Sequence, residues 1–233
     1  MLGTIVNSIA IIAGALFGVI LKKGIPERIK DTMMHGIGLC VLYIGISGAL
    51  KGENTLILII SMIVGTLIGE GIDLQDKVER LGKCMERAVK RLTKHGKEEE
   101  TDNSFANAFV TTTLVVCVGA MAIVGSLESG LQGQHDILFS KAVLDCIIAV
   151  MFASAMGIGV MFSAIPLFIY QGAITILAGL IAPYLTETTI SEMTCVGSVI
   201  MMGLALNMLG LSKFKVSNFI PAVFIPILLC MFM

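Results

Sequence analysis

Asp73-Leu-Gln-Asp-Lys-Val-Glu-Arg-Leu81 opens the longest polar stretch of the chain, residues 73–103, and the sequence is predominantly apolar on both sides of it. Apolar residues recur in it at alternating spacings of four and three residues, which places them on one face of a helix. Acidic residues come first and basic residues later, the order that suits a helix dipole. The apolar residues are Leu74, Val78, Leu81, Met85, Ala88 and Leu92. The stretch therefore predicts one amphipathic surface helix between two apolar parts of the chain.

The composition of the 233 residues is not that of a soluble globular domain. Hydrophobic residues make up 56% of the chain and charged residues only 14%, and the mean hydropathy is +0.92. The six cysteines are widely spaced and form no CxxC pair, so neither a disulfide framework nor a metal site is indicated. The bases stand beside acids on one helix without an aromatic platform, so we expect no nucleic-acid partner.

The apolar segments on both sides of the polar stretch are long enough to cross a bilayer as helices of about 20 residues. We expect an all-α polytopic membrane protein with about eight transmembrane helices; seven spans plus a re-entrant segment is the alternative. We expect a hinge at Ser163-Ala-Ile-Pro166 between the fifth and sixth spans, and the short last span holds Pro221 and Pro226. The predicted spans are residues 2–21, 32–50, 55–72, 105–127, 140–162, 165–185, 190–209 and 218–232.

The distribution of basic residues predicts how the chain is oriented. Three spans lie in residues 1–72 and five in residues 105–233, and the polar residues 73–104 connect them within a single membrane domain. With eight spans, 14 of the 16 Lys and Arg residues fall on one side. Because cytoplasmic loops are rich in bases, we expect residues 73–104 in the cytoplasm, both termini outside, and a bacterial inner membrane. Residues 77–97 would contact anionic lipid.

The first and last parts of the chain resemble each other weakly. Ile11-Ile-Ala-Gly-Ala-Leu16 in the first span corresponds to Ile176-Leu-Ala-Gly-Leu-Ile181 in the sixth, and Gly36 in the second to Gly197 in the seventh. Because odd spans would pair with even spans, the two copies would have opposite orientations, as in many secondary transporters. The alternative is that Leu, Ile, Ala and Gly align by chance in any two apolar segments.

Polar side chains inside the spans are the candidate binding residues, because an unpaired charge or amide is costly in lipid. Asp145 is the acid placed deepest in an apolar segment, one helical turn after Lys141. It would hold a coupling cation or proton, or form an interfacial ion pair whose lysine reaches the headgroups. The amides would bind solute, or else bond neighbouring helices. The candidate substrate- or ion-binding residues are Asn7, Asp145, Gln171, Asn207 and Asn218.

Two charged residues are candidates for a gate or an interfacial role. Glu70 lies at the cytoplasmic end of the third span, where it would cap the helix, meet solvent or act as a gate. Lys141 is the second, as the partner of Asp145. Small-residue pairs such as Gly14 with Gly18, and Gly65 with Gly69, favour close helix packing within one subunit, and a homo-oligomer face is the alternative.

The sequence carries no recognisable catalytic motif. The sequence holds no G-x-S-x-G, no HExxH and no P-loop, so we expect neither an enzyme nor a cofactor.

Several motifs together resemble the YqgA/YdfK-type family of bacterial membrane proteins, over essentially the whole chain. They are Gly3-Thr-Ile-Val-Asn7, Cys117-Val-Gly-Ala-Met-Ala-Ile-Val-Gly-Ser126, Lys141-x-x-x-Asp145, Tyr170-Gln-Gly172, Gly203-x-x-x-Asn207 and Lys215-Val-x-Asn218-x-x-Pro221. The resemblance implies a polytopic inner-membrane protein, and because the family is a domain of unknown function it implies no substrate. Ala120 stands where the family pattern has Pro, and we expect this difference to straighten the fourth span.

The leading hypothesis for function is a transporter of a small solute or ion, in which Asp145 binds a coupling cation and the amides bind solute. The first alternative is an oligomeric channel with Gly-rich helices around a pore. The second is a membrane scaffold that acts through the cytoplasmic helix without transporting anything.

Overall fold

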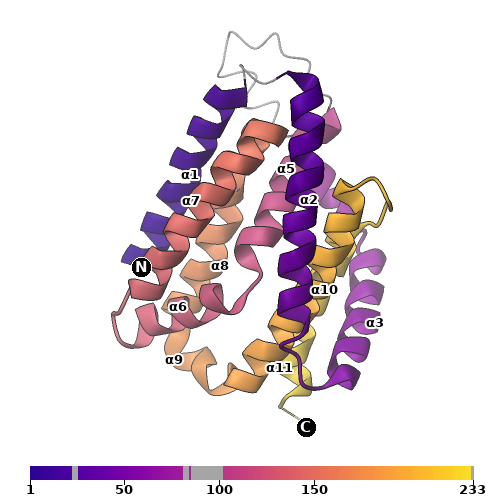
Figure 1. Cartoon of the computed structure of the whole chain (residues 1–233). Helices are drawn as coiled ribbons and strands as arrows, with labels where there is room; N and C mark the ends of the chain where they lie inside the picture. The colour runs from indigo at the N-terminus through magenta and orange to yellow at the C-terminus, as the bar shows by residue number, and fades with distance from the viewer. Residues whose placement is uncertain (23–25, 81–83, 85–101, 232–233) are drawn as a thin grey trace.

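The computed structural model describes residues 1–22, 26–80, 84 and 102–231, and every regular element in these ranges is helical. Long helices run side by side in a bundle (Figure 1). The elements, with η for 3-10 helices, are α1 (Leu2–Lys22), α2 (Glu27–Ala49), α3 (Thr55–Gly71), α5 (Asp102–Cys117), α6 (Ala120–Leu131), α7 (Asp136–Met156), η1 (Ile158–Ser163), α8 (Ala164–Ile176), α9 (Ala178–Ile181), η2 (Ala182–Tyr184), α10 (Glu187–Met208), η3 (Val216–Phe224) and α11 (Ile225–Leu229). The predicted all-α fold is confirmed.

The described helices account for the predicted spans. Five are each long and apolar enough to cross a membrane, and seven crossings result if each of two bent helix pairs is one span. The short eighth span corresponds to the apolar helix Val216–Leu229. In Figure 1 α1 ends and α2 begins at the top, whereas both chain ends lie in the lower half. The chain is therefore a polytopic membrane protein.

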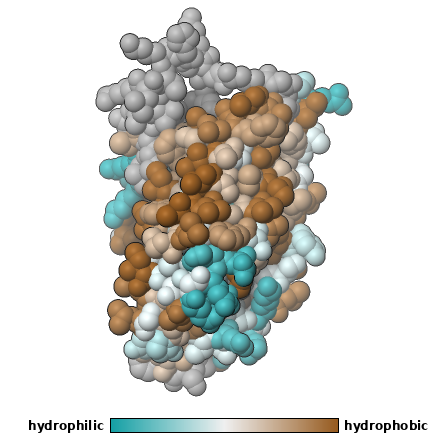
Figure 2. All heavy atoms as spheres, turned by 90° about the vertical axis from the view of Figure 1, so that its left-hand side faces the viewer, coloured by the Kyte–Doolittle hydropathy of each residue, from teal (hydrophilic) through white to brown (hydrophobic). Residues whose placement is uncertain are grey.

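The outer surface of the bundle suits a bilayer. Large apolar side chains are exposed along α1 and α7, among them Ile9, Phe17 and Val143. Figure 2, which faces this side, shows hydrophobic residues over most of the surface and a hydrophilic group in its lower half. Hydrocarbon can solvate the apolar residues without cost, so their exposure is expected for a membrane protein.

Two helix breaks differ from the sequence prediction, and glycine explains both. The predicted hinge at residues 163–166 is wrong, because α7 ends at Met156 and Gly157 follows with φ 95°. The expectation that Ala120 straightens the fourth span is also wrong, since α5 and α6 meet at an angle of 61° beside Gly119, with φ 127°. Both φ values lie in the region that favours glycine, so glycine sets the breaks whether or not proline is nearby.

Close helix contacts are made through glycine, as predicted. A Cβ on Gly14 or Gly18 of α1 would lie 2.5 or 2.4 Å from a carbonyl oxygen of α7. A Cβ on Gly65 of α3 would lie 2.3 Å from the backbone of Ala222 in η3. These small residues therefore serve packing inside one chain, and they hold α1 against α7 and α3 against η3.

The start of the predicted amphipathic helix is present. A helix over Leu74–Arg80 follows α3 at an angle of 55°, and Asp73 takes a positive φ of 47° at the bend. Most of the remaining prediction lies outside the described residues, which include only residues 77–80 and 84 of the segment 77–97 that was expected to contact anionic lipid.

Candidate functional site

One face of α1 carries the residues that build the site. Its buried residues recur three or four positions apart and, except for Ile11, are small or polar; they include Thr4, Asn7 and Ser8. The Oγ of Ser8 donates to the carbonyl of Thr4, which satisfies that hydroxyl within its own helix. The opposite face is apolar and exposed. Packing of the small face against α7 therefore brings Asn7 into the interior of the bundle.

Asn7 lies at the meeting point of three helices. Its Nδ2 donates to Oδ2 of Asp145 on α7 at 3.0 Å and to Oε1 of Gln171 on α8 at 3.5 Å. The same Asp145 oxygen accepts from Nζ of Lys141, one turn earlier on α7, at 2.5 Å. All four side chains are buried. We name Asn7, Lys141, Asp145 and Gln171 the α1–α7–α8 cluster.

Part of the hydrogen-bonding capacity of this cluster is unused. Oδ1 of Asn7 and Nε2 of Gln171 are buried without a partner among the described residues. The same holds for the hydroxyls of Thr4, one turn before Asn7, and Thr175, one turn after Gln171. An unsatisfied buried polar group costs about 1–3 kcal/mol. One atom of each of the two amide groups and both hydroxyls therefore retain unused hydrogen-bonding capacity.

A second polar cluster ties α3 to η3. Oε2 of Glu70 accepts from Nδ2 of Asn218 at 2.5 Å, and its Oε1 accepts from Nζ of Lys215 at 2.9 Å. The Glu70 carboxylate raises the pKa of Lys215 above its ordinary value of 10.5, chiefly through the hydrogen bond. Glu70 and Lys215 are both more than half exposed, so this pair lies at the surface.

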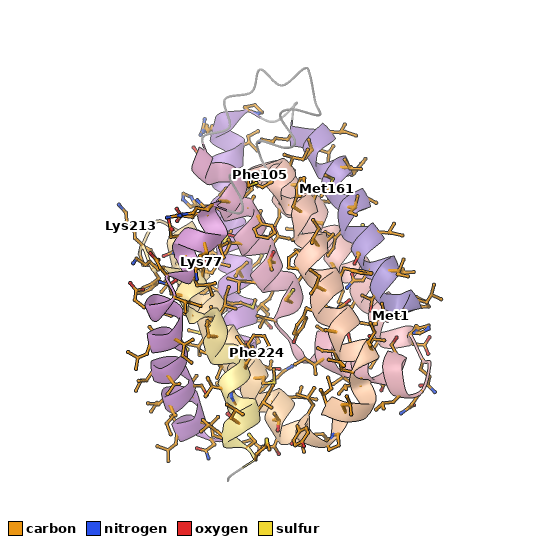
Figure 3. The ribbon with its side chains drawn as sticks, turned by 180° about the vertical axis from the view of Figure 1, so that it is seen from behind. Met1, Lys77, Phe105, Met161, Lys213 and Phe224 are labelled. Carbon is orange, nitrogen blue, oxygen red and sulfur yellow. The ribbon has the colours of Figure 1, made fainter. Side chains whose placement is uncertain are left out.

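Asn218 also fastens the start of the amphipathic helix. Its Oδ1 accepts from the backbone N–H of Gln75 at 2.7 Å, while Oε1 of Gln75 accepts from the backbone N–H of Ser217 at 3.3 Å. This pair of bonds joins the helix over Leu74–Arg80 to the first turn of η3. Figure 3 shows Lys77 and Lys213 on one side of the bundle and Met1 on the opposite side.

Asn207 has a local structural role. Its Oδ1 accepts from Oγ of Ser212 at 2.7 Å and from the backbone N–H of Phe214 at 2.8 Å, and its Nδ2 donates to the Phe214 carbonyl at 2.8 Å. These bonds shape the turn after α10. Asn207 also lines a cavity of about 70 Å³ together with Gln75 and Ser217.

Apart from Asn207, which bonds the turn after α10, the predicted site residues therefore divide into two groups. Asn7, Asp145 and Gln171 lie together and include the predicted gate residue Lys141. Asn218 lies with the other predicted gate residue, Glu70. Among the described residues, no three His, Cys, Asp or Glu side chains converge to hold a metal ion.

Glu192 is a buried acid that the sequence prediction missed. It is fully buried on α10, and its Oε1 accepts from the backbone N–H groups of Glu53 and Asn54 at 2.7 and 2.8 Å. Asn54 in turn caps α3 by accepting from the N–H of Leu56. Glu192 therefore anchors the α2–α3 connection. Its position two residues inside a predicted span was the available signal.

Comparisons with known proteins agree on one family. The family described as "Protein of unknown function (DUF554)" matches residues 2–231. The chain is 30% identical over 230 residues to the Bacillus subtilis (strain 168) "Uncharacterized membrane protein YdfK", covering 97% of this chain and 94% of the relative. It is 30% identical over 222 residues to the Escherichia coli (strain K12) "Uncharacterized protein YqgA", covering 95% and 93%. No solved structure matches the chain.

Proposed function

The chain belongs to the DUF554 family, which includes a membrane protein of Bacillus subtilis, and we propose that it transports a small polar solute or ion across the bacterial inner membrane. The observation that carries the proposal is the α1–α7–α8 cluster. Ionisable and amide side chains inside a membrane domain are costly and are retained mainly at ion or substrate sites. In this chain four such side chains, from three helices, are buried together, and some of their hydrogen-bonding atoms have no partner among the described residues.

The ion pair defines what the cluster can do. Lys141 neutralises Asp145, so no net charge is buried, and a buried pair of this kind is stable only while both partners remain. A cation at Asp145 would replace the ammonium group of Lys141. The amide of Asn7, which donates to the same carboxylate oxygen, would feel that exchange directly. Ion binding at Asp145 and solute binding at the two amides would therefore be coupled.

An inverted repeat is part of the proposal and is supported by which helices touch. The proposed repeat pairs α1 with α8, α2 with α10, and α3 with η3, and the members of each pair pack against each other. With Ile11 matched to Ile176, Asn7 falls one position from Gln171 in the first pair, and the two side chains are in contact. In transporters with inverted repeats, the substrate site lies where the two copies meet and where helices are interrupted.

We also propose the orientation that the basic residues favour. Residues 73–104 face the cytoplasm, both termini lie outside, and the α1–α7–α8 cluster lies nearer the outer end, because Asn7 is in the second turn of α1. The second cluster, around Glu70, then lies toward the cytoplasmic end.

Ligand-dependent stabilisation of the purified protein tests the proposal. A solute that binds the folded state at a hundredfold excess over its Kd raises the free energy of unfolding by about 2.7 kcal/mol. The panel covers alkali cations, inorganic anions and small polar metabolites. We expect at least one compound to raise the melting temperature of the native chain and of Gln132→Leu, an exposed residue. Gln171→Leu removes the unpaired amide and should abolish that rise. A rise retained in Gln171→Leu contradicts the assigned site.

A further inference from the structure

A large apolar cavity lies away from both polar clusters. It has a volume of about 420 Å³ and is enclosed by residues of α6, α8, α9, η2, α10, η3 and α11. This volume is within the range of ligand pockets, about 300–1,000 Å³. The lining of the cavity includes Phe224 of η3, which is labelled in Figure 3, and several residues of α8. The break between α8 and α9 at Leu177 turns the chain aside and leaves this space.

The floor and the rim of the cavity differ in exposure. The floor is formed by the buried side chains of Ile123, Ile174 and Met193. The rim includes Ile169 and Phe224, which are 64% and 47% exposed. Because Ile169 lies in the middle of α8, the mouth extends along the side of the bundle, and it continues toward the end of the bundle at the exposed Tyr184 and Met231. In a membrane protein that side faces hydrocarbon.

The chemistry of the lining selects an apolar occupant. Among the described residues that line the cavity, only Tyr170 and Tyr184 carry a polar side-chain group. A water molecule is stable in a cavity when it finds two to four polar partners, which this lining does not offer. Hydrocarbon loses nothing by contact with Ile, Leu, Met and Phe side chains. We propose that one acyl chain of a bilayer phospholipid enters through the mouth and occupies this cavity.

The proposal does not depend on transport. It assigns a lipid site between α8 and η3–α11, and it would hold equally for a channel or a scaffold. One side of α8 would contact the acyl chain at Tyr170, while the next residue, Gln171, belongs to the polar cluster. Any influence of lipid chain length on ligand binding would pass through this helix.

Tyrosine fluorescence gives a direct test, because the chain contains three tyrosines and no tryptophan. Tyr43→Phe with Tyr184→Phe leaves Tyr170 in the cavity as the emitter. Tyr170→Phe with Tyr184→Phe leaves Tyr43, which is 72% exposed on α2 and serves as the positive control. Each variant is reconstituted into phosphatidylcholine vesicles with plain or mid-chain-brominated acyl chains, since bromine quenches emission on contact. We expect both Tyr43 and Tyr170 to be quenched by the brominated chains.

A larger side chain inside the cavity distinguishes an acyl chain that is inserted in the cavity from bilayer lipid that only contacts its mouth. Ala173 lines the cavity, and Ala13 is an exposed residue of α1 away from it. Ala173→Phe should lower the quenching of Tyr170 at least twofold, Ala173→Leu should lower it less, and Ala13→Phe should leave it unchanged. The smaller Ala173→Leu keeps the test available if the Phe variant does not fold. Quenching of Tyr43 without Tyr170, or quenching of Tyr170 that both Ala173 variants leave intact, overturns the proposal.

Discussion

Asn7 and Asp145 are separated by 138 positions in the chain, and the amide of one donates to the carboxylate of the other at 3.0 Å. This bond can form only because α1 lies against α7 through Gly14 and Gly18, where an added Cβ would meet carbonyl oxygens. Close packing by small residues and placement of the polar residues are thus two aspects of one contact between helices.

The buried pair of Lys141 and Asp145 predicts an asymmetric response to mutation. Asp145→Asn leaves the ammonium group of Lys141 uncompensated, and we expect a loss of about 3–5 kcal/mol in the free energy of unfolding. The charge swap Lys141→Asp with Asp145→Lys restores the pair and should recover part of that loss. Unfolding in detergent micelles measures both. Asp136→Asn, an exposed acid in the first turn of α7, is the control. Equal stability of Asp145→Asn and Asp136→Asn would refute the buried ion pair.

Alanine substitution at two glycines should change the free energy of unfolding in opposite directions, because Gly18 lies in the α1–α7 contact and Gly36 does not. Gly18→Ala places a Cβ 2.4 Å from the carbonyl oxygen of Val150, so the helices must separate. Overpacking of this kind costs about 1–3 kcal/mol. A Cβ on Gly36 of α2 would meet nothing within 4 Å. Gly36→Ala should therefore stabilise by about 0.5–1 kcal/mol, as alanine does in a helix interior. A melting curve for each variant checks the signs, and a stabilising Gly18→Ala would contradict the packing.

Removal of the Glu192 side chain should destabilise the protein more than its replacement by glutamine. Glu192→Ala deprives the N–H groups of Glu53 and Asn54 of their acceptor, and we expect a loss of about 1–3 kcal/mol for each group left without a partner. Glu192→Gln retains an acceptor oxygen and should lose less. Glu187→Ala in the exposed first turn of α10 is the control, at no more than about 1 kcal/mol. Chemical unfolding measures the series. If Glu192→Ala and Glu187→Ala lower the free energy of unfolding by the same small amount, Glu192 does not anchor the α2–α3 connection.

The ion pair of Lys215 with Glu70 should lower the reactivity of the Lys215 amine at alkaline pH. Glu70 raises the pKa of Lys215, so the ammonium form persists to higher pH and the free amine is scarcer. The stabilisation from this pair is present below the ordinary pKa of 10.5 and is lost as the pH rises through the raised value. At pH 9, an amine-selective acylating reagent should modify Lys215 faster in Glu70→Gln than in the native chain. Mass spectrometry of the labelled peptide measures the rate, with Lys213 as internal reference. Identical rates would show that Glu70 does not hold this ammonium group.

The all-α membrane fold could be predicted from the sequence because each transmembrane helix is encoded by a long, predominantly apolar run. Runs of about 20 apolar residues define crossing helices whatever the details of packing. The helix breaks were harder to place. Pro166 lies in the first turn of α8 and does not interrupt the helix. Gly119 and Gly157 take positive φ values, which many other glycines of the chain do not adopt. The sequence offers no local sign that separates these glycines from the others.

The candidate site was predictable in part for a similar reason. Asn7, Asp145 and Gln171 are polar residues in apolar spans, and the cost of burying them brings them together. Asn207 looked equivalent in sequence, yet it lies at a helix end, where backbone groups of the following turn satisfy its amide. Glu192 was missed because an acid near a span boundary resembles one in solvent; a connection 138 residues away in sequence buries it.

Solute flux into proteoliposomes, measured with a compound that stabilises the purified protein, tests whether the α1–α7–α8 cluster is the transport site. The account predicts saturable uptake by the native chain and by Asp136→Asn, and at least a tenfold loss of uptake in Asn7→Leu and in the charge-swapped Lys141→Asp with Asp145→Lys. Uptake at the native rate in both cluster variants would contradict the claim that this buried cluster is the transport site.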